Sequence, residues 1–273
     1  VQATVPMLRG VWGAALKHVD AGVYETVFNG AGPPHDRTPL YVMRPGPPDA
    51  SDFPILEWIS IGGAIRHDRE LVRAWDVASG MGLGPRRRMF RIRRYRLLAP
   101  DGEPSGDCAA GEGWTLDKVR PPCAMGAPAR LVFSTPLRII RNHRLVAKPG
   151  AADVAVAAHR RVGSFLSGDA AGAWQALQRE ILDAARSLPC GEWRGQRTDM
   201  VRYSGSQERE VEVHGVSGSL ELPEGPGELW PLLAASAWLH VGKAATMGCG
   251  RLLVTNTEDG QTSRRRRHSR RST

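Results

Sequence analysis

The feature that most constrains the fold of this chain is a glycine loop that occurs twice. The stretches SGMGLGPRRRMFRI (79–92) and ATMGCGRLLV (245–254) share Met-Gly-x-Gly, then arginine, then an apolar run, and they lie 166 positions apart. Apolar residues at helical spacing precede both loops, in HDRELVRAWDVAS (67–79) and in ELWPLLAASAWLHV (228–241). This separation indicates a duplicated unit rather than a short-period repeat.

The rest of each half predicts the same order of elements. In the first half, VQATVPML is typical of a strand and RGVWGAALKHV of a helix, and PLYVMR and FPILEWISI are extended before the helix and glycine loop. In the second, ARLVFSTPLRII predicts a strand, 153–187 a helical region, and MVRYSGSQEREVEVHGVSGSLELPE a strand pair. We therefore predict an α+β fold of two tandem ferredoxin-like (β-α-β-β-α-β, RRM-like) domains with a C-terminal glycine-rich loop.

A Pro/Gly-rich stretch, VRPPCAMGAPA (119–129), interrupts the pattern between the halves. We place an N-terminal domain at 1–126 and a C-terminal domain at 127–257. The arginine-rich tail at 258–273 is predicted to be disordered, because its like charges repel and it has no apolar anchors.

The charge of the chain points to a polyanionic partner. The formal net charge is +9, and the tail contributes only +4 of it, so the body of the chain is basic by itself. Nucleic acid is the commonest polyanion for such a protein. The alternative is a cationic surface that serves solubility alone.

Several other classes of protein are excluded. The chain has no apolar run of 18 residues and no signal-peptide layout, so we expect a soluble, cytoplasmic protein without a membrane partner. Four scattered cysteines lack zinc spacing, and we predict no metal and no cofactor. The Gly242-Lys243 pair is not a P-loop, because Ala237 and Ala244 stand where that motif needs Gly and Ser or Thr.

Five stretches, spread through the chain except the tail, together resemble a known family. They are LRGVWGAALK (8–17), VYETVFNG followed by PLYVM (23–43), FSTPLRI (133–139), RYSGSQE (202–208) and LHVGKAATMGCGRLLV (239–254). The chain resembles the RAMP superfamily of CRISPR-associated proteins, and more closely the endoribonucleases that process precursor CRISPR RNA (crRNA).

The resemblance implies a metal-independent endoribonuclease that acts on the repeat of precursor crRNA. The ribose 2′-OH attacks the adjacent phosphate and leaves a 2′,3′-cyclic phosphate and a 5′-OH. The implied partners are the repeat hairpin and other subunits of a CRISPR effector complex.

This chemistry needs a base, an acid and positive charge on the phosphorane, and histidine suits either proton role. The family places its acid/base histidine on the first helix or in the loop after it, which makes His35 and His18 the catalytic candidates. Lys17, Arg37 and Tyr41 are their candidate partners. The alternatives are a helix C-terminal histidine for His18 and an exposed loop residue for His35.

The remaining histidines that we considered have ordinary explanations. His67 suits a helix start, His143 a turn, His159 a solvated helix face and His214 a strand pair, and His268 lies in the tail.

The run GPRRRMFRIRRYR (84–96) is the densest basic feature outside the tail. As a strand it would place Arg87, Met89, Arg91 and Arg93 on one face, and Arg86, Arg88, Phe90, Ile92 and Arg94 on the other. We predict RNA contacts from Arg86, Arg87, Arg88, Arg91 and Arg93, and from Arg138 in FSTPLRI. The alternative is a solvated edge strand whose arginines discourage aggregation.

Glycine lets backbone N–H groups come close to phosphate, because no Cβ intervenes. For this reason Gly242, Lys243, Gly248, Gly250 and Arg251 are predicted RNA contacts. The loop can equally serve only to turn the helix sharply into the strand.

Two other functions remain open. The chain can be a non-catalytic RAMP subunit that holds crRNA in an effector complex, or a basic DNA-binding or ribosome-associated protein. The first would bind the repeat without cutting it, and the second would show no preference for repeat RNA over duplex DNA.

Overall fold

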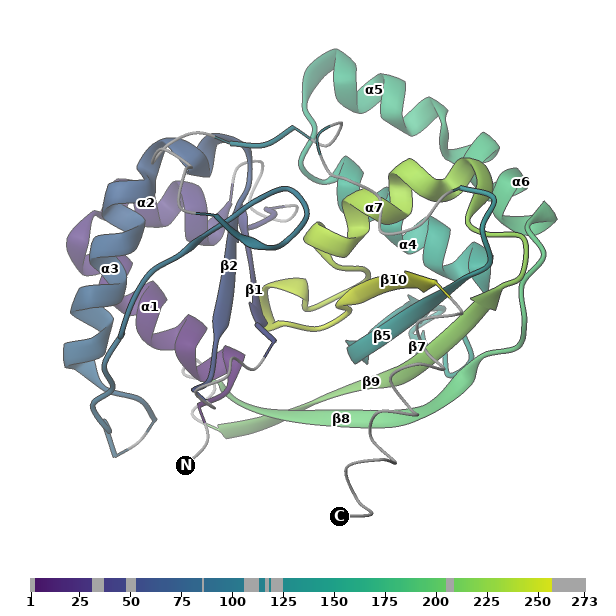
Figure 1. Cartoon of the computed structure of the whole chain (residues 1–273). Helices are drawn as coiled ribbons and strands as arrows, with labels where there is room; N and C mark the ends of the chain where they lie inside the picture. Colours follow the sequence, from purple (N-terminus) through teal and green to yellow (C-terminus); the bar gives the residue numbers. More distant parts are fainter. Residues whose placement is uncertain are drawn as a thin grey trace. The chain divides into compact units, whose positions relative to one another are not determined.

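The computed structural model (Figure 1) describes residues 3–30, 37–47, 53–84, 86–105, 113–115, 118, 125–204 and 209–256, and of 201–204 and 209–211 only the backbone. The chain divides into two compact units. Unit 1 comprises 1–118, 200–213 and 244–249, and unit 2 comprises 119–199, 214–243 and 250–273. The domain boundary at 126 remains a prediction, and the tail from 258 lies outside the described residues.

Unit 1 is built mainly from helices on a strand pair. Its elements are α1 (Val5–Val19), α2 (Ala21–Val23), the π-helix η1 (Tyr24–Asn29), β1 (Tyr41–Pro45), β2 (Leu56–Ser60), the 3₁₀ helix η2 (Gly62–His67), α3 (Asp68–Met81), β3 (Leu97–Leu98), β4 (Pro104–Ser105) and the 3₁₀ helix η5 (Ala245–Met247). Strands β1 and β2 pair antiparallel, with Met43 opposite Trp58.

Trp12 of α1 lies at the centre of the unit 1 core. Its ring contacts Tyr41, Trp58 and Trp75 at centroid distances of 5.1, 5.0 and 6.0 Å. Its indole N–H donates to the carbonyl of Leu71 in α3 at 3.3 Å, so the one polar atom of this buried side chain is satisfied. The aromatic cluster therefore ties α1 to α3 and to the strand pair.

The predicted first strand of unit 1 is wrong. Residues 5–8 belong to α1, which begins at Val5 with Pro6 in its first turn. Proline is favoured there, because the first turn of a helix leaves its N–H groups without intrahelical partners. Val5 and Leu8 pack against the aromatic core, so apolar residues whose sequence resembles a strand are held in a helix by tertiary contacts.

The predicted strand over 86–94 is also wrong. After α3 the chain makes a tight turn in which the N–H groups of Leu83 and Arg88 donate to each other's carbonyls at 2.8 and 3.0 Å. From Met89 to Arg96 the described chain is assigned to no strand. The predicted alternation of faces survives, because Phe90 and Ile92 pack on the core while Met89, Arg91 and Arg93 are exposed.

Unit 2 is built around a four-stranded sheet. Its elements are β5 (Ala129–Leu137), β6 (Ile140–Arg141), β7 (Arg144–Leu145), α4 (Ala151–Gly163), α5 (Gly168–Ala176), α6 (Gln178–Ser187), β8 (Arg194–Ser204), β9 (Arg209–Leu222), the 3₁₀ helix η4 (Gly227–Leu229), α7 (Trp230–Leu239) and β10 (Leu252–Asn256). The outer ends of β8 and β9 fall in the residue range of unit 1.

The sheet of unit 2 has the ferredoxin-like arrangement. Its strand order is β10-β5-β9-β8, and the chain passes through β5, α4, β8, β9, α7 and β10 in the predicted β-α-β-β-α-β order. Leu131 lies opposite Leu220, and Phe133 lies opposite Leu252. All four side chains are buried, and helices α4, α6 and α7 cover this face of the sheet (Figure 1).

The predicted helical region 153–187 consists of three helices. His159 of α4, only 2% exposed, stacks on Trp174 of α5 at 5.0 Å. Its Nε2 lies 2.8 Å from the carbonyl of Trp174, whose indole N–H donates to the carbonyl of His159 at 2.9 Å. The interpretation of His159 as a solvated residue is therefore wrong, and its ring joins α5 to α4.

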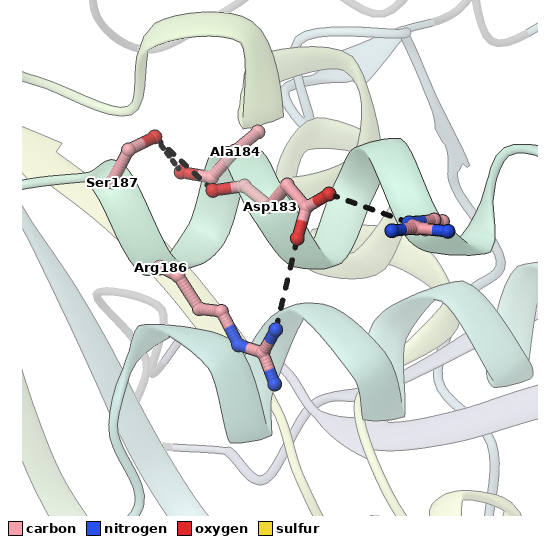
Figure 2. Close-up of polar contacts among 5 residues, drawn as sticks. Asp183, Ala184, Arg186 and Ser187 are labelled. Carbon is pink, nitrogen blue, oxygen red and sulfur yellow. Dashed lines mark hydrogen bonds and ion pairs between the residues drawn. The ribbon is translucent and has the colours of Figure 1, made fainter.

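Helix α6 carries its charges in pairs. Asp183 lies 3.9 Å from Arg179 and 3.7 Å from Arg186, one helical turn away on either side (Figure 2). The hydroxyl of Ser187 donates to the carbonyls of Asp183 and Ala184, both at 3.1 Å, near the end of the helix (Figure 2).

In the described part of the chain, no helix combines the length and apolar character needed to cross a membrane.

Candidate nucleic-acid interface

The described catalytic candidates of the first helix lie at its C-terminal end. Lys17 and His18 are both in the last turn of α1 and both exposed, where a cation is favoured by the helix dipole. The ammonium of Lys17 lies 5.7 Å from the ring centroid of Tyr24 in η1. His35 lies outside the described residues.

A tyrosine that the sequence reasoning missed lies beside these residues. Tyr24 is half-buried, and its ring stacks on that of Phe28 with a centroid distance of 4.8 Å. The guanidinium of Arg9 lies 4.3 Å from the centroid of the Phe28 ring. Burial, followed by the charge of Glu25, raises the pKa of Tyr24. The available signal was the Tyr-x-x-x-Phe spacing in VYETVFNG, which places both rings on one face of a helix.

The other two candidate partners occupy different environments. Arg37 is exposed, with its guanidinium 3.7 Å from Glu25, a weak surface pair. Tyr41 is 0% exposed in the core, and burial raises its pKa to about 12. Its phenol therefore stays protonated at neutral pH and has no access to solvent, so Tyr24 is the better placed of the two tyrosines to meet RNA.

Residues 86–96, named the basic arm here, present cations to solvent. All seven of its arginines, at 86, 87, 88, 91, 93, 94 and 96, are exposed. Arg93 stacks on Phe53 at 3.6 Å, and the Tyr95 hydroxyl donates to Asp76 at 2.9 Å. Among the described residues, Arg86, Arg88 and Arg91 have no acidic partner, so their charge is available to an external anion.

Both glycine loops need glycine for their own geometry. Gly82 and Gly84 have φ of 76° and 67°, and Gly248 and Gly250 have φ of 85° and 71°. L-residues rarely adopt such values. A Cβ on Gly250 would lie 1.9 Å from the carbonyl oxygen of Val241, which no rearrangement of a side chain relieves.

Part of the second loop is already hydrogen-bonded within unit 2. The N–H groups of Lys243 and Gly250 donate to the carbonyls of Arg138 and Pro136 at 2.9 and 3.0 Å, and the Arg251 N–H donates to Thr135 at 2.8 Å. These donors hold the loop and are not directed at a ligand. The exposed Lys243 side chain is the part of the loop best placed to reach a phosphate.

A further residue that the sequence analysis set aside gains a partner in the structure. His214 of β9 lies with its Nδ1 3.0 Å from the carboxylate of Asp199 in β8, which also accepts from Arg197 at 3.2 Å. The hydrogen bond to His214, then Arg197, holds the pKa of Asp199 below its usual range. A carboxylate at Nδ1 orients an imidazole and leaves Nε2 for other contacts. Among the described residues, no three His, Cys, Asp or Glu side chains cluster as a metal site would require.

Part of the sequence matches a known family. Residues 131–252 match the family described as "CRISPR-associated endoribonuclease Cas6". No curated protein matches the chain.

Solved structures of Cas6 proteins share the fold of both units. The product complex of Cas6 TTHB231 has a TM-score of 0.58 at 15% identity and covers 92% of each chain. Thermus thermophilus Cas6 TTHB231 by itself has a TM-score of 0.53 at 13% identity, covering 92% of this chain and 90% of that one. The product complex of Cas6 TTHA0078 has a TM-score of 0.53 at 16% identity and covers 93% of each chain.

These findings confirm the α+β fold class with tandem ferredoxin-like units. The match over residues 131–252 also agrees with the resemblance to CRISPR-associated endoribonucleases. The site residues named from the sequence remain predictions.

Proposed function

We propose that this chain is a Cas6-type endoribonuclease that binds the repeat hairpin of precursor crRNA and cuts it without a metal, by attack of the ribose 2′-OH. The products carry a 2′,3′-cyclic phosphate and a 5′-OH. The observation that carries the proposal is the exposed basic arm, whose arginines at 86, 88 and 91 lack an acidic partner among the described residues, on a fold shared with Cas6 product complexes.

The reaction divides into two proton transfers and one exchange of bonds at phosphorus. A base removes the 2′-OH proton while O2′ attacks phosphorus, and an acid protonates O5′ as the P–O5′ bond breaks. Positive charge stabilises the phosphorane in between. His18 or His35 takes a proton role, and Lys17 and Arg37 supply charge.

Tyr24 is a candidate contact for the substrate at the same place. Its ring lies between the Lys17 ammonium and Phe28, on an accessible part of unit 1. Tyr41 is not assigned a proton role, because its pKa of about 12 and its burial exclude exchange with substrate near pH 7.

A second candidate for the acid/base is His214. The support is the 3.0 Å contact of its Nδ1 with Asp199, which orients the ring as a carboxylate orients a catalytic histidine. His214 belongs to unit 2, and His18 and His35 belong to the residue range of unit 1. Which of them acts as the acid or base is decided by the variants described below.

RNA binding is assigned to the basic arm and to the side chains of Lys243, Arg251 and Arg138. Gly242, Gly248 and Gly250 shape the loop that carries Lys243 and Arg251, since the N–H groups of Gly248 and Gly250 already donate within the protein. A hairpin repeat suits this set, because duplex RNA is recognised by shape and by phosphate contacts more than by base edges. The product is either retained or passed to other subunits of an effector complex.

The test is a cleavage assay on labelled repeat RNA in EDTA, beside the same RNA with a single 2′-deoxy ribose at the mapped cut. Cleavage that persists in EDTA and is abolished by the deoxy sugar is the expected result. Cleavage that needs a divalent metal or survives the deoxy sugar contradicts the mechanism. Tight binding without cleavage identifies a non-catalytic crRNA-holding subunit instead.

Single variants then assign the acid/base. His18→Ala, His35→Ala and His214→Ala are compared with His143→Ala, an exposed turn histidine that serves as the matched control. Loss of a catalytic histidine lowers the rate by about 10² to 10⁴ and leaves RNA affinity nearly unchanged. If no single variant does so, a mechanism based on arginine and lysine is indicated.

A further inference from the structure

A hollow lies at the end of the basic arm, within unit 1. Its volume is about 470 Å³, and it is lined by Tyr95, Arg96, Leu97, Pro104 and Ser105. The hollow is open to solvent, so a ligand would lie against its lining rather than be enclosed by it. Tyr95 and Arg96 are the last two residues of the basic arm, and Leu97, Pro104 and Ser105 lie beyond it.

One wall of the hollow is a short hairpin. Leu97 and Leu98 of β3 pair with Ser105 and Pro104 of β4. The turn between them is closed by N–H donation from Gly102 to the Ala99 carbonyl at 2.9 Å, and Gly102 has a φ of 86°. The turn has the form of a type I turn with a following left-handed glycine, which holds two strands in register.

Tyr95 offers an aromatic face that is held in place. The side chain is 50% exposed, yet its hydroxyl donates to Asp76 of α3 at 2.9 Å. Burial, then this hydrogen bond, raises the pKa of Tyr95, so the hydroxyl remains a donor at neutral pH. A ring fixed in advance loses little conformational entropy when a flat ligand stacks on it.

The chemistry around the ring favours a ligand with both a flat apolar part and a negative charge. Arg96 lines the hollow, and exposed Leu97 adds apolar surface beside it. Asp101 and Glu103 lie at the hairpin turn, so an anion approaches from the side of the arm.

We propose that this hollow binds one unstacked nucleotide of the repeat RNA, with its base on the ring of Tyr95 and a phosphate on Arg96. The inference rests on the proposed repeat-RNA function and adds a subsite to it. Sequence-specific RNA recognition works through unpaired bases that stack on aromatic or arginine side chains, which this hollow places together. The arm then binds backbone phosphates that lead up to this nucleotide.

A crosslinking experiment on the full chain locates the nucleotide. Repeat RNA carrying 4-thiouridine at one position at a time is irradiated with the protein, and crosslinked peptides are identified by mass spectrometry. One unpaired position is expected to crosslink to the segment 95–105. Crosslinks confined to other segments overturn the inference.

Matched variants test the two contacts. Tyr95→Ser is expected to weaken repeat-RNA binding about five- to hundredfold, while Tyr95→Phe retains most of the affinity. Trp114→Ser, at an exposed aromatic outside the hollow, is the control and leaves affinity unchanged. Arg96→Ala lowers the salt slope of binding by about 0.7, and Arg73→Ala on α3 does not.

An abasic substitution keeps the test decisive if Tyr95→Ser fails to fold. Removing the base at the crosslinked position is expected to weaken binding to the wild-type chain as much as Tyr95→Ser does. Intact binding of the abasic RNA overturns the inference.

The failure of this inference differs from that of the proposed function. Normal cleavage in EDTA with no effect of Tyr95→Ser or of abasic RNA rejects the subsite alone. Absence of cleavage with a crosslink from an oligouridine probe to 95–105 rejects the proposed function and retains the subsite. If neither the repeat nor oligouridine crosslinks to 95–105, the subsite is rejected.

Discussion

The basic arm and helix α6 both expose arginines, but they differ in the acidic partners that the described residues offer. On α6, Arg179 and Arg186 lie on either side of Asp183, at 3.9 and 3.7 Å (Figure 2). On the arm, Arg86, Arg88 and Arg91 have no acidic partner among the described residues.

The difference follows from backbone conformation. In a helix, residues three and four apart are neighbours, so one aspartate can serve two arginines. From Met89 to Arg94 the faces of the arm alternate, so neighbours on one face are two apart, and arginine or apolar residues stand at those positions. Arg86 and Arg88 lie in the turn before this segment. The arginines at 86, 88 and 91 therefore keep a charge that no acidic side chain among the described residues neutralises, whereas Arg179 and Arg186 share Asp183.

The largest test of this contrast removes the arm's cations. The triple variant Arg86→Ala, Arg88→Ala and Arg91→Ala is expected to raise the dissociation constant for repeat RNA roughly five- to tenfold for each arginine near 0.1 M salt, with a salt slope shallower by about 0.7 to 0.9 each. Fluorescence anisotropy at several salt concentrations measures both quantities. The control, Arg179→Ala with Arg186→Ala on α6, changes affinity by about twofold or less. Equal losses from the two variants would abolish the contrast.

The next test loosens the arm from its support. Phe90→Ala removes a half-buried ring that packs on the unit 1 core and is expected to lower the free energy of unfolding by about 1 to 3 kcal/mol. Met89→Ala, at a neighbour that is 68% exposed, changes it by about 0.5 kcal/mol or less. Chemical denaturation measures both. A similar cost at the two positions would mean that the arm is not anchored by its inward face.

A third test makes α6 resemble the arm. Asp183→Ala removes the shared partner of two arginines, so we expect RNA affinity to rise about two- to fivefold without sequence preference. Stability falls by about 0.5 to 1 kcal/mol, the sum of two surface pairs. Glu180→Ala on the same helix makes the same change in net charge and serves as the control. If both variants bind RNA alike, total charge rather than pairing decides the affinity.

The smallest effect concerns the position of the arm. Arg93 stacks on Phe53 at 3.6 Å, a contact worth about 0.5 to 1 kcal/mol. A double-mutant cycle of Arg93→Ala and Phe53→Leu, followed by thermal unfolding, is expected to give a coupling energy of about 0.5 kcal/mol. A coupling of zero would assign Arg93 to RNA alone.

The sequence predicted the features that depend on local geometry. The repeated Met-Gly-x-Gly loops have positive φ at all four glycines, values that few other residues tolerate. His143 is a turn residue with a φ of 61°, and His67 directly precedes α3, as predicted. The order of strands and helices in unit 2 could also be predicted from the sequence. Its strands show a hydrophobic period of 2 residues and its helices a period of 3.6, and the two are easily told apart.

Features that depend on a partner distant in sequence were missed. The contact of His214 with Asp199 joins two strands and needs their register, which the sequence pattern does not contain. His159 was misassigned because its stacking partner, Trp174, lies on another helix. The start of α1 was predicted as a strand because the sequence pattern does not show that Val5 and Leu8 pack against the aromatic core of unit 1.

By itself, the sequence determined the duplicated glycine loops, the ferredoxin-like order of unit 2, the basic character of the chain and the alternation of faces along 89–93. These follow from steric limits on φ, from side-chain periodicity and from charge, which act over a few residues. The tertiary structure alone decided that the arm runs without a strand partner, that Tyr41 is buried while Tyr24 is accessible, and that Tyr95 borders a hollow. Burial and pairing depend on which distant segments pack together. The free energy of a contact depends on both residues that make it, and the second residue lies far away in the sequence.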